Sequence, residues 1–146
     1  MQTILAWTMI IFGGALYLAQ LISSINFSLA QKLGLQENPD NTDSLLIRSE
    51  KYVAYWDLVA LIWFPVSGFL MLINHQWWPI FSIFAGAIYL DAAGREAFKN
   101  LSFKHHGLKV GNQKQWILFF ATYIFMASLA LLVITHSMIA LHPMST

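Results

Sequence analysis

Residues 85–98 read Ala-Gly-Ala-Ile-Tyr-Leu-Asp-Ala-Ala-Gly-Arg-Glu-Ala-Phe, and they close a long apolar stretch with an acid and a guanidinium. Asp91 and Arg95 are four residues apart, so they share one face if the segment is helical. In a bilayer such groups are costly and are candidates for function by default. The stretch predicts a membrane helix with a polar site in its second half, although it names no reaction.

The composition is typical of a membrane protein. Of the 146 residues, 58% are hydrophobic and 10% are charged, whereas roughly 25% are charged in ordinary soluble domains. The length is enough for one domain. The absence of Cys excludes a disulfide framework and a thiolate metal site. The net charge of +1 gives no indication of nucleic-acid binding.

Four stretches are long enough to cross a membrane, which takes about 20 largely apolar residues. No Lys or Arg precedes the first stretch, which favours a retained helix over a cleaved signal peptide. Helices satisfy every backbone group in lipid, so we expect an all-α integral membrane protein built as a four-transmembrane-helix bundle. Small residues such as Gly13, Gly14, Gly86 and Gly94 favour close helix packing. The predicted spans are about 3–29, 52–73, 79–98 and 116–141, the third continuing as a helix to about 103.

Basic residues predict the orientation of the bundle. The first and third connections and the adjacent helix ends hold all eight Lys and Arg, whereas the second connection and both termini hold none. By the positive-inside rule, loops 30–51 and 99–115 are cytoplasmic and both termini are non-cytoplasmic. We therefore expect a multi-pass protein of a cell inner membrane. The eight residues are Lys32, Arg48, Lys51, Arg95, Lys99, Lys104, Lys109 and Lys114.

Turn and cap residues predict several helix ends. Residues 38–41, Asn-Pro-Asp-Asn, are typical of a turn, and one of residues 42–44 is expected to cap the next helix. Pro65 and Gly68 predict a bend in the second span. Pro79 fits the first turn of the third.

Polar side chains from all four predicted spans fall in the cytoplasmic third of the membrane. In the fourth span these are Gln115 and either Thr122 or Tyr123. Asp57 has no base four residues later, since position 61 is Leu, so its expected partner is Arg95 on the neighbouring helix. Their convergence predicts a cavity that opens to the cytoplasm. The candidate ligand-binding residues are Tyr17, Gln20, Ser24, Asp57, Tyr89, Asp91 and Arg95.

Two interpretations of this polar cluster remain open. Membrane Ser, Asn and Gln commonly bond neighbouring helices, and an Asp–Arg pair near a helix end is often a structural bridge. Alternatively, the cluster binds a ligand or performs chemistry, with Asp57, Asp91 and Arg95 as the catalytic candidates. In an enzyme, Arg95 would bind an anionic head group, an Asp would accept a proton, and Tyr17 or Tyr89 would donate one.

Histidines raise the question of haem, which the sequence does not require. His75 and His136 lie near the non-cytoplasmic ends of the second and fourth spans, where a bis-histidine haem b would need ligands on facing helices. We favour interfacial histidines, because His75 is in a connection. The adjacent pair His105 and His106 lacks the usual helical ligand spacing for a metal. The sequence contains no phosphate loop, nucleophile elbow or HExxH motif.

Two families share this architecture. Residues 86–95, together with Arg48 at the position where the family's second span begins, resemble the MAPEG membrane proteins, which implies a trimer with a cytoplasm-facing glutathione or lipid site. Residues 56–68 and the Trp116-led fourth span resemble HemJ/CopD-like four-span bacterial proteins. Neither signature is intact: Tyr52 and Tyr55 stand where MAPEG proteins have Asn and Glu, and the first span lacks the HemJ-type His.

Two functions therefore stay open. The first is a binding component, either an accessory subunit of a larger membrane complex or a homo-oligomer, which holds a lipid-like or quinone-like ligand. The second is a small enzyme that acts on an amphiphile, as a MAPEG-like transferase or a HemJ-like oxidoreductase. The lipid bilayer is the expected environment in both cases, and nucleic acid is not an expected partner.

Overall fold

The computed structural model describes residues 1–142, most of which are helical. In this range the backbone forms no β-strand, and an isolated antiparallel bridge joins Thr42 to Val110. The all-α prediction is therefore confirmed. The elements are α1 (Gln2–Ile25), α2 (Phe27–Lys32), the 3-10 helix η1 (Pro39–Asn41), α3 (Ser44–Ala60), α4 (Trp63–Leu72), α5 (Trp78–His105) and α6 (Gln113–Leu141).

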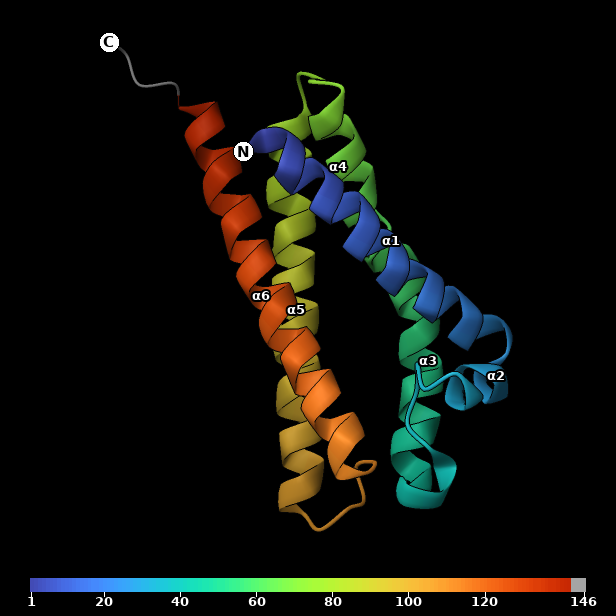
Figure 1. The fold of residues 1–146 in the computed structure, drawn as a ribbon. Helices are drawn as coiled ribbons and strands as arrows, with labels where there is room; N and C mark the ends of the chain where they lie inside the picture. Colours follow the sequence, from blue (N-terminus) through green and yellow to red (C-terminus); the bar gives the residue numbers. More distant parts are fainter. Residues whose placement is uncertain (143–146) are drawn as a thin grey trace.

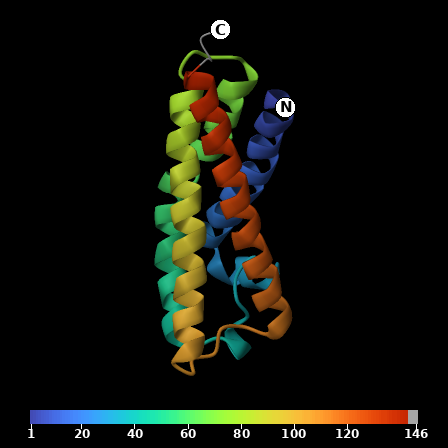
Figure 2. The same cartoon turned by 90° about the vertical axis from the view of Figure 1, so that its left-hand side faces the viewer.

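The long helices run up and down beside one another, and their connections gather at two ends (Figures 1 and 2). Helices α5 and α6 form one antiparallel pair, while α1 packs across α4 and α3. Helix α4 also packs against α5, and so it joins the α5–α6 pair to α1 and α3. The N-terminus and the end of α6 lie at the same end as the 73–77 connection (Figure 1). We call the opposite end, with connections 33–43 and 106–112, the basic end.

The first predicted helix, 3–29, is wrong at its C-terminal end. Helix α1 stops at Ile25, and Asn26 adopts an extended backbone with φ −144°. The Asn26 side chain accepts a hydrogen bond from the Leu29 backbone N–H at 3.0 Å, which caps a separate short helix, α2. Asparagine is among the strongest N-cap residues, so a local cap ends the apolar run early.

The second predicted span is one helical stretch with a break. It begins at Ser44, where the Asp43 side chain accepts a hydrogen bond from the Leu45 N–H at 2.9 Å. The break lies at residues 61–62. Pro65 has no N–H to bond the Leu61 carbonyl, which instead accepts from the Phe64 N–H at 3.3 Å. The interruption lies one turn before Pro65, where the sequence predicts a bend, and the missing donor of Pro65 explains it.

Three helical segments are long and apolar enough to cross a membrane: α1, the Ser44–Leu72 stretch of α3 and α4, and α6. The structure thus supports a membrane protein. The third predicted span, 79–98, falls within α5, which is 28 residues long. Helix α5 is not among these three, and its second half carries Asp91, Arg95, Glu96 and Lys99. The four-span count therefore goes beyond what the three apolar helices support.

Close packing between helices relies on glycine at two places. A Cβ built on Gly68 of α4 would lie 2.8 Å from the Met9 Cβ and 2.9 Å from the Ala6 carbonyl of α1. One built on Gly86 of α5 would lie 2.7 Å from the Ile134 Cγ1 of α6. Glycine therefore sets the separation of both helix pairs, as is common in membrane bundles.

Candidate functional site

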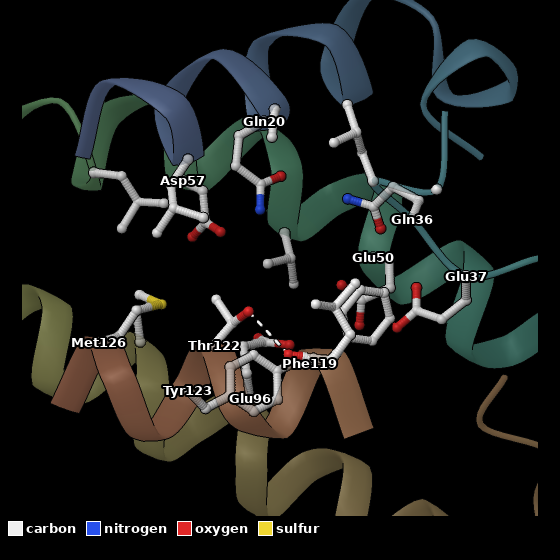
Figure 3. A pocket seen from close by; sticks show the side chains of 18 residues that line it. Gln20, Gln36, Glu37, Glu50, Asp57, Glu96, Phe119, Thr122, Tyr123 and Met126 are labelled. Atoms are coloured by element: carbon white, nitrogen blue, oxygen red, sulfur yellow. Dashed lines mark hydrogen bonds between the residues drawn. The ribbon is translucent and has the colours of Figure 1, made fainter. Parts of the chain in front are cut away.

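A cavity of about 240 Å³ lies between α1, α3, α5 and α6, near the basic end (Figure 3). One wall is apolar and is formed largely by side chains of α1 and α6. The opposite wall is polar and is formed mainly by α3, α5 and the 34–37 loop, while Gln20 of α1 and Thr122 and Tyr123 of α6 add polar groups. The apolar wall includes Leu16, Ala19, Leu61, Leu118, Phe119 and Met126, and the polar lining includes Gln20, Gln36, Glu37, Glu50, Asp57 and Glu96.

Arg95 is the centre of a carboxylate network on α3 and α5. Its Nη2 donates to the Asp57 Oδ1 at 3.4 Å, and its Nη1 lies 3.9 Å from Asp91. Its Nε lies 3.7 Å from the Glu96 Oε1. The expected Asp57–Arg95 pair is therefore present, and Asp57 is 4% exposed. Three carboxylates around one guanidinium leave Arg95 little positive charge for an anionic ligand.

Lys99 joins two further carboxylates one helical turn away. Its ammonium donates to the Glu50 Oε1 of α3 at 2.5 Å, and it also pairs with the Glu96 Oε2. Lys99, Glu50 and Glu96 are all largely buried. Nearby, Asn100 Nδ2 donates to the Tyr123 Oη at 3.1 Å, which ties α5 to α6. The ion pairs hold α3 and α5 together at the polar wall.

The connection between α2 and α3 folds inward and supplies two more polar groups. Gly34 takes a φ of +73°, which L side chains rarely adopt, and ends α2 by a tight turn. Gln36 Nε2 donates to the Ser23 Oγ of α1 at 3.1 Å, and Gln31 Nε2 donates to the Glu37 carbonyl at 3.0 Å. These bonds bury Gln36 and Glu37 at 6% and 5% exposure.

The same connection is fixed to the α5–α6 loop. Asp43 N–H donates to the Lys109 carbonyl at 2.9 Å, and Gly111 N–H donates to the Asn41 carbonyl at 3.1 Å. The Cβ position of Gly111 lies 3.8 Å from the Glu37 Cγ. The two connections at the basic end therefore close that side of the cavity.

Glu37 is a buried carboxylate without a counter-ion. Within residues 1–142 its carboxylate forms no ion pair and no hydrogen bond with another side chain. Burial raises the pKa of the Glu37 carboxyl, while a backbone hydrogen bond and the Lys99 charge partly offset this and Glu96 adds to it. Its side chain points into the cavity (Figure 3).

The Glu37→Gln variant is expected to melt higher than the ligand-free wild type as the pH rises. Since the folded-state pKa of Glu37 lies above its ordinary value of 4.5, the folded state retains a proton that the unfolded state has lost. Wild-type stability therefore falls as the pH rises above about 4.5. Glutamine removes this dependence, and each kcal/mol corresponds to about 2–4 °C. Melting curves from pH 4 to 9 in one detergent measure the difference, and a constant difference across that range would contradict the expected titration.

The seven predicted ligand-binding residues are only partly brought together. Gln20 and Asp57 line the cavity. Asp91 and Arg95 instead line a shallow groove on the other side of α5, beside Trp56 and Trp63. Three more candidates also lie outside the cavity lining: Tyr17, Ser24 and Tyr89. The Ser24 hydroxyl donates to the Leu21 carbonyl at 2.8 Å. Tyr89 is fully buried, and its ring stacks on that of Phe64 with ring centroids 3.8 Å apart.

Sequence reasoning missed several residues of the polar wall. Glu50 and Lys99 were expected in or beside cytoplasmic loops, and Gln36 and Glu37 in a solvated connection. The i, i+3 spacing of Glu96 and Lys99 was the available signal, because it places both on one face of α5. Nothing in the sequence indicates that the 34–37 loop turns inward.

His75 and His136 make separate contacts. His75 Nδ1 accepts a hydrogen bond from the Trp77 N–H at 3.3 Å within its own connection. The His136 ring stacks on that of Trp78, with ring centroids 5.7 Å apart. Among residues 1–142 there is no group of three or more His, Asp or Glu that could hold a metal ion. The polar residues of the cavity are acids, amides and hydroxyls, and no histidine is among them.

The architectural resemblance to MAPEG and HemJ/CopD-like proteins stays a prediction. In comparisons with protein-family models, curated proteins and solved structures, none matched this chain.

Proposed function

We propose that this protein binds one small amphiphilic molecule, lipid-like or quinone-like, in the cavity between α1, α3, α5 and α6. The observation that carries the proposal is the division of one cavity into an apolar wall and a polar wall with unsatisfied acceptors. Gln20 Oε1 and Glu96 Oε1 are buried without a hydrogen-bond donor. Such groups cost about 1–3 kcal/mol each when left unpaired, so a ligand that pairs them gains affinity.

We infer that the apolar wall opens toward the side of the bundle, between α1 and α6. Phe12 of α1 and Phe125 of α6 meet edge to face with ring centroids 4.6 Å apart, and the cavity lies beyond them toward the basic end. There Leu118 both lines the cavity and is 58% exposed. An opening between α1 and α6 would face the acyl chains of a bilayer. It allows an apolar tail to enter from the membrane while the head group reaches the polar wall.

The charge distribution favours binding over the catalytic alternative. The catalytic alternative requires Arg95 to hold an anionic head group. However, Arg95 already has three carboxylate neighbours, and it lines the groove beside Trp56 and Trp63 and not the cavity. Asp91, one of the two proposed proton acceptors, is 74% exposed on the same outer side. The catalytic candidates Asp57, Asp91 and Arg95 therefore act better as an ion-pair network that shapes the cavity wall.

The proposal includes the membrane arrangement expected from the sequence. In it, α5 is the third of four spans, the basic end is cytoplasmic, and both termini are non-cytoplasmic in a cell inner membrane. Large apolar side chains support it, because they cover the outer faces of α1 and α6, including Ile4, Ile11, Ile117, Ile124 and Leu131. The polar second half of α5 faces α3 and α6 through Glu96, Lys99 and Asn100.

Filling the cavity should abolish the stabilisation that a ligand gives. We expect delipidated wild-type protein to melt several degrees higher after incubation with an extract of its own membrane, because a ligand at 100 times its Kd adds about 2.7 kcal/mol. Ala19→Phe and Thr122→Phe, which fill the cavity from α1 and α6, should not respond.

The matched control is Ala121→Phe, since Ala121 is exposed on α6 and is not a cavity residue. It should respond as the wild type does. An equal shift in all four proteins would mean that the extract acts elsewhere on the surface, and the cavity proposal would then be wrong.

A further inference from the structure

The acidic and basic side chains differ in where they lie, and those that line the cavity are all carboxylic acids. They are Glu37, Glu50, Asp57 and Glu96, and no Lys, Arg or His is among the lining residues. The four carboxylates come from the inward-folded loop, α3 and α5, so three parts of the chain contribute acid to one space (Figure 3). An anionic ligand would find no basic partner among the lining side chains, and it would be repelled by each of these acids that is ionised.

Two basic residues behind the wall form ion pairs with three of these acids. Arg95 pairs with Asp57, and Lys99 pairs with both Glu50 and Glu96. Glu37 is the remaining acid, buried at 5% exposure with no ion-pair partner in residues 1–142. A carboxylate in that position is costly unless a cation reaches it.

Unpartnered acceptors in the cavity indicate a ligand that donates hydrogen bonds. The Gln20 Oε1 is an uncharged acceptor that is buried without a donor, and the Gln20 amide points into the cavity (Figure 3). The Glu96 Oε1, although 3.7 Å from the Arg95 Nε, also has no hydrogen-bond donor. These groups need N–H or O–H donors from the ligand, which an ester, a quinone or a carboxylate lacks. Of the two ligand classes in the proposed function, they therefore favour a lipid-like molecule with a donor head group over a quinone-like one.

We propose that the bound amphiphile carries a cationic N–H head group, a primary or secondary ammonium, and that Glu37 is its counter-ion. This inference rests on the proposed function, which supplies the cavity and its membrane-facing opening. The ammonium forms a charge-assisted hydrogen bond with Glu37, and unpartnered acceptors such as Gln20 accept further donors on the head group. The apolar tail lies against the α1 and α6 wall.

Three probes with one chain length test the head group: decylamine, decanol and decanoate. We expect native mass spectrometry of delipidated protein at pH 7.5 to show decylamine bound at least tenfold more tightly than decanol, with no decanoate complex. Glu37→Gln should weaken decylamine at least tenfold and leave decanol within twofold. Glu37→Asp, which keeps the charge, should retain the preference for the amine.

Asp40→Asn is the matched control, because Asp40 is an exposed acid in the same connection. It should bind decylamine as the wild type does. Equal affinities for decylamine and decanol, or decylamine binding that survives Glu37→Gln unchanged, would overturn the ammonium assignment. Preference for decanoate would overturn it as well.

The two proposals fail in different ways. If Ala19→Phe abolishes binding of all the probes that the wild type binds, but no amine preference exists, the cavity binds a ligand of different head-group chemistry. If Ala19→Phe changes none of the affinities, the probes do not use the cavity, and both proposals are wrong.

Discussion

Lys99→Met is expected to lower the free energy of unfolding by about 3–5 kcal/mol, because it leaves a buried ion-pair network without its central cation. Lys99 is 16% exposed and is the ammonium that pairs with both Glu50 and Glu96. Methionine fills a similar volume but leaves two carboxylates of α3 and α5 facing each other. Like charges in a largely buried site repel strongly, so the two helices should separate there.

Thermal unfolding in a mild detergent measures this effect. Lys51→Met is the matched control, because Lys51 is exposed on α3 and forms no ion pair within residues 1–142. It should change stability by less than about 0.5 kcal/mol. Adding Glu50→Gln to Lys99→Met should recover part of the loss, since one of the two carboxylates left facing each other is then removed. A Lys99→Met protein as stable as the wild type would refute the buried ion-pair network.

Gly68→Ala is expected to cost about 1–3 kcal/mol by forcing α1 and α4 apart. The added Cβ would lie 2.8 Å from the Met9 Cβ and 2.9 Å from the Ala6 carbonyl, and neither atom belongs to the free end of a flexible side chain. Gly68→Val should cost more than Gly68→Ala, because the branched side chain adds further atoms to the same contact.

Gly14→Ala is the control for helix propensity. A Cβ on Gly14 of α1 would have no neighbour within 4 Å, so alanine should be neutral or stabilising by up to about 1 kcal/mol. Melting temperatures of the three variants in one detergent provide the comparison. If Gly14→Ala and Gly68→Ala shift stability equally, close approach of α1 and α4 at Gly68 is not what the residue provides.

Hydropathy and turn chemistry were sufficient to predict the helical architecture. The spans centred on α1, the α3–α4 stretch and α6 follow from apolar length, and the Asp43 cap and the Pro65 bend follow from local hydrogen bonding. The early end of α1 at Ile25 was missed because a continuous apolar run hides the stronger local preference of Asn26 to cap. Apolar length alone does not locate such caps.

Helix contacts at small residues were also only partly predictable from the sequence. Gly86 and Gly94 are equally good candidates for helix contact in the sequence, yet only Gly86 meets a neighbouring helix. Which face of α5 is covered depends on the crossing of α6, and that is decided by tertiary packing. A glycine in a membrane helix therefore predicts a contact only when the partner helix is known.

The candidate site was predictable where one helix or one simple pair decides it. The depth of Asp57 and Arg95 and the lack of a base near Asp57 were enough to predict their ion pair, which is observed at 3.4 Å. The contribution of Glu37 was not predictable, because a polar connection with turn residues normally stays in water. Its burial depends on hydrogen bonds between Gln36 and Ser23 and between two distant loops.

The most direct test of ligand binding is a native mass spectrum of wild-type protein extracted gently from its own membrane, beside Ala19→Phe and Ala121→Phe. The proposed function predicts the 16.6 kDa chain, or a multiple of it, with a small adduct on wild type and Ala121→Phe that is lost from Ala19→Phe. A wild-type spectrum without any adduct, or the same adduct on all three proteins, would contradict a ligand held in the cavity between α1, α3, α5 and α6.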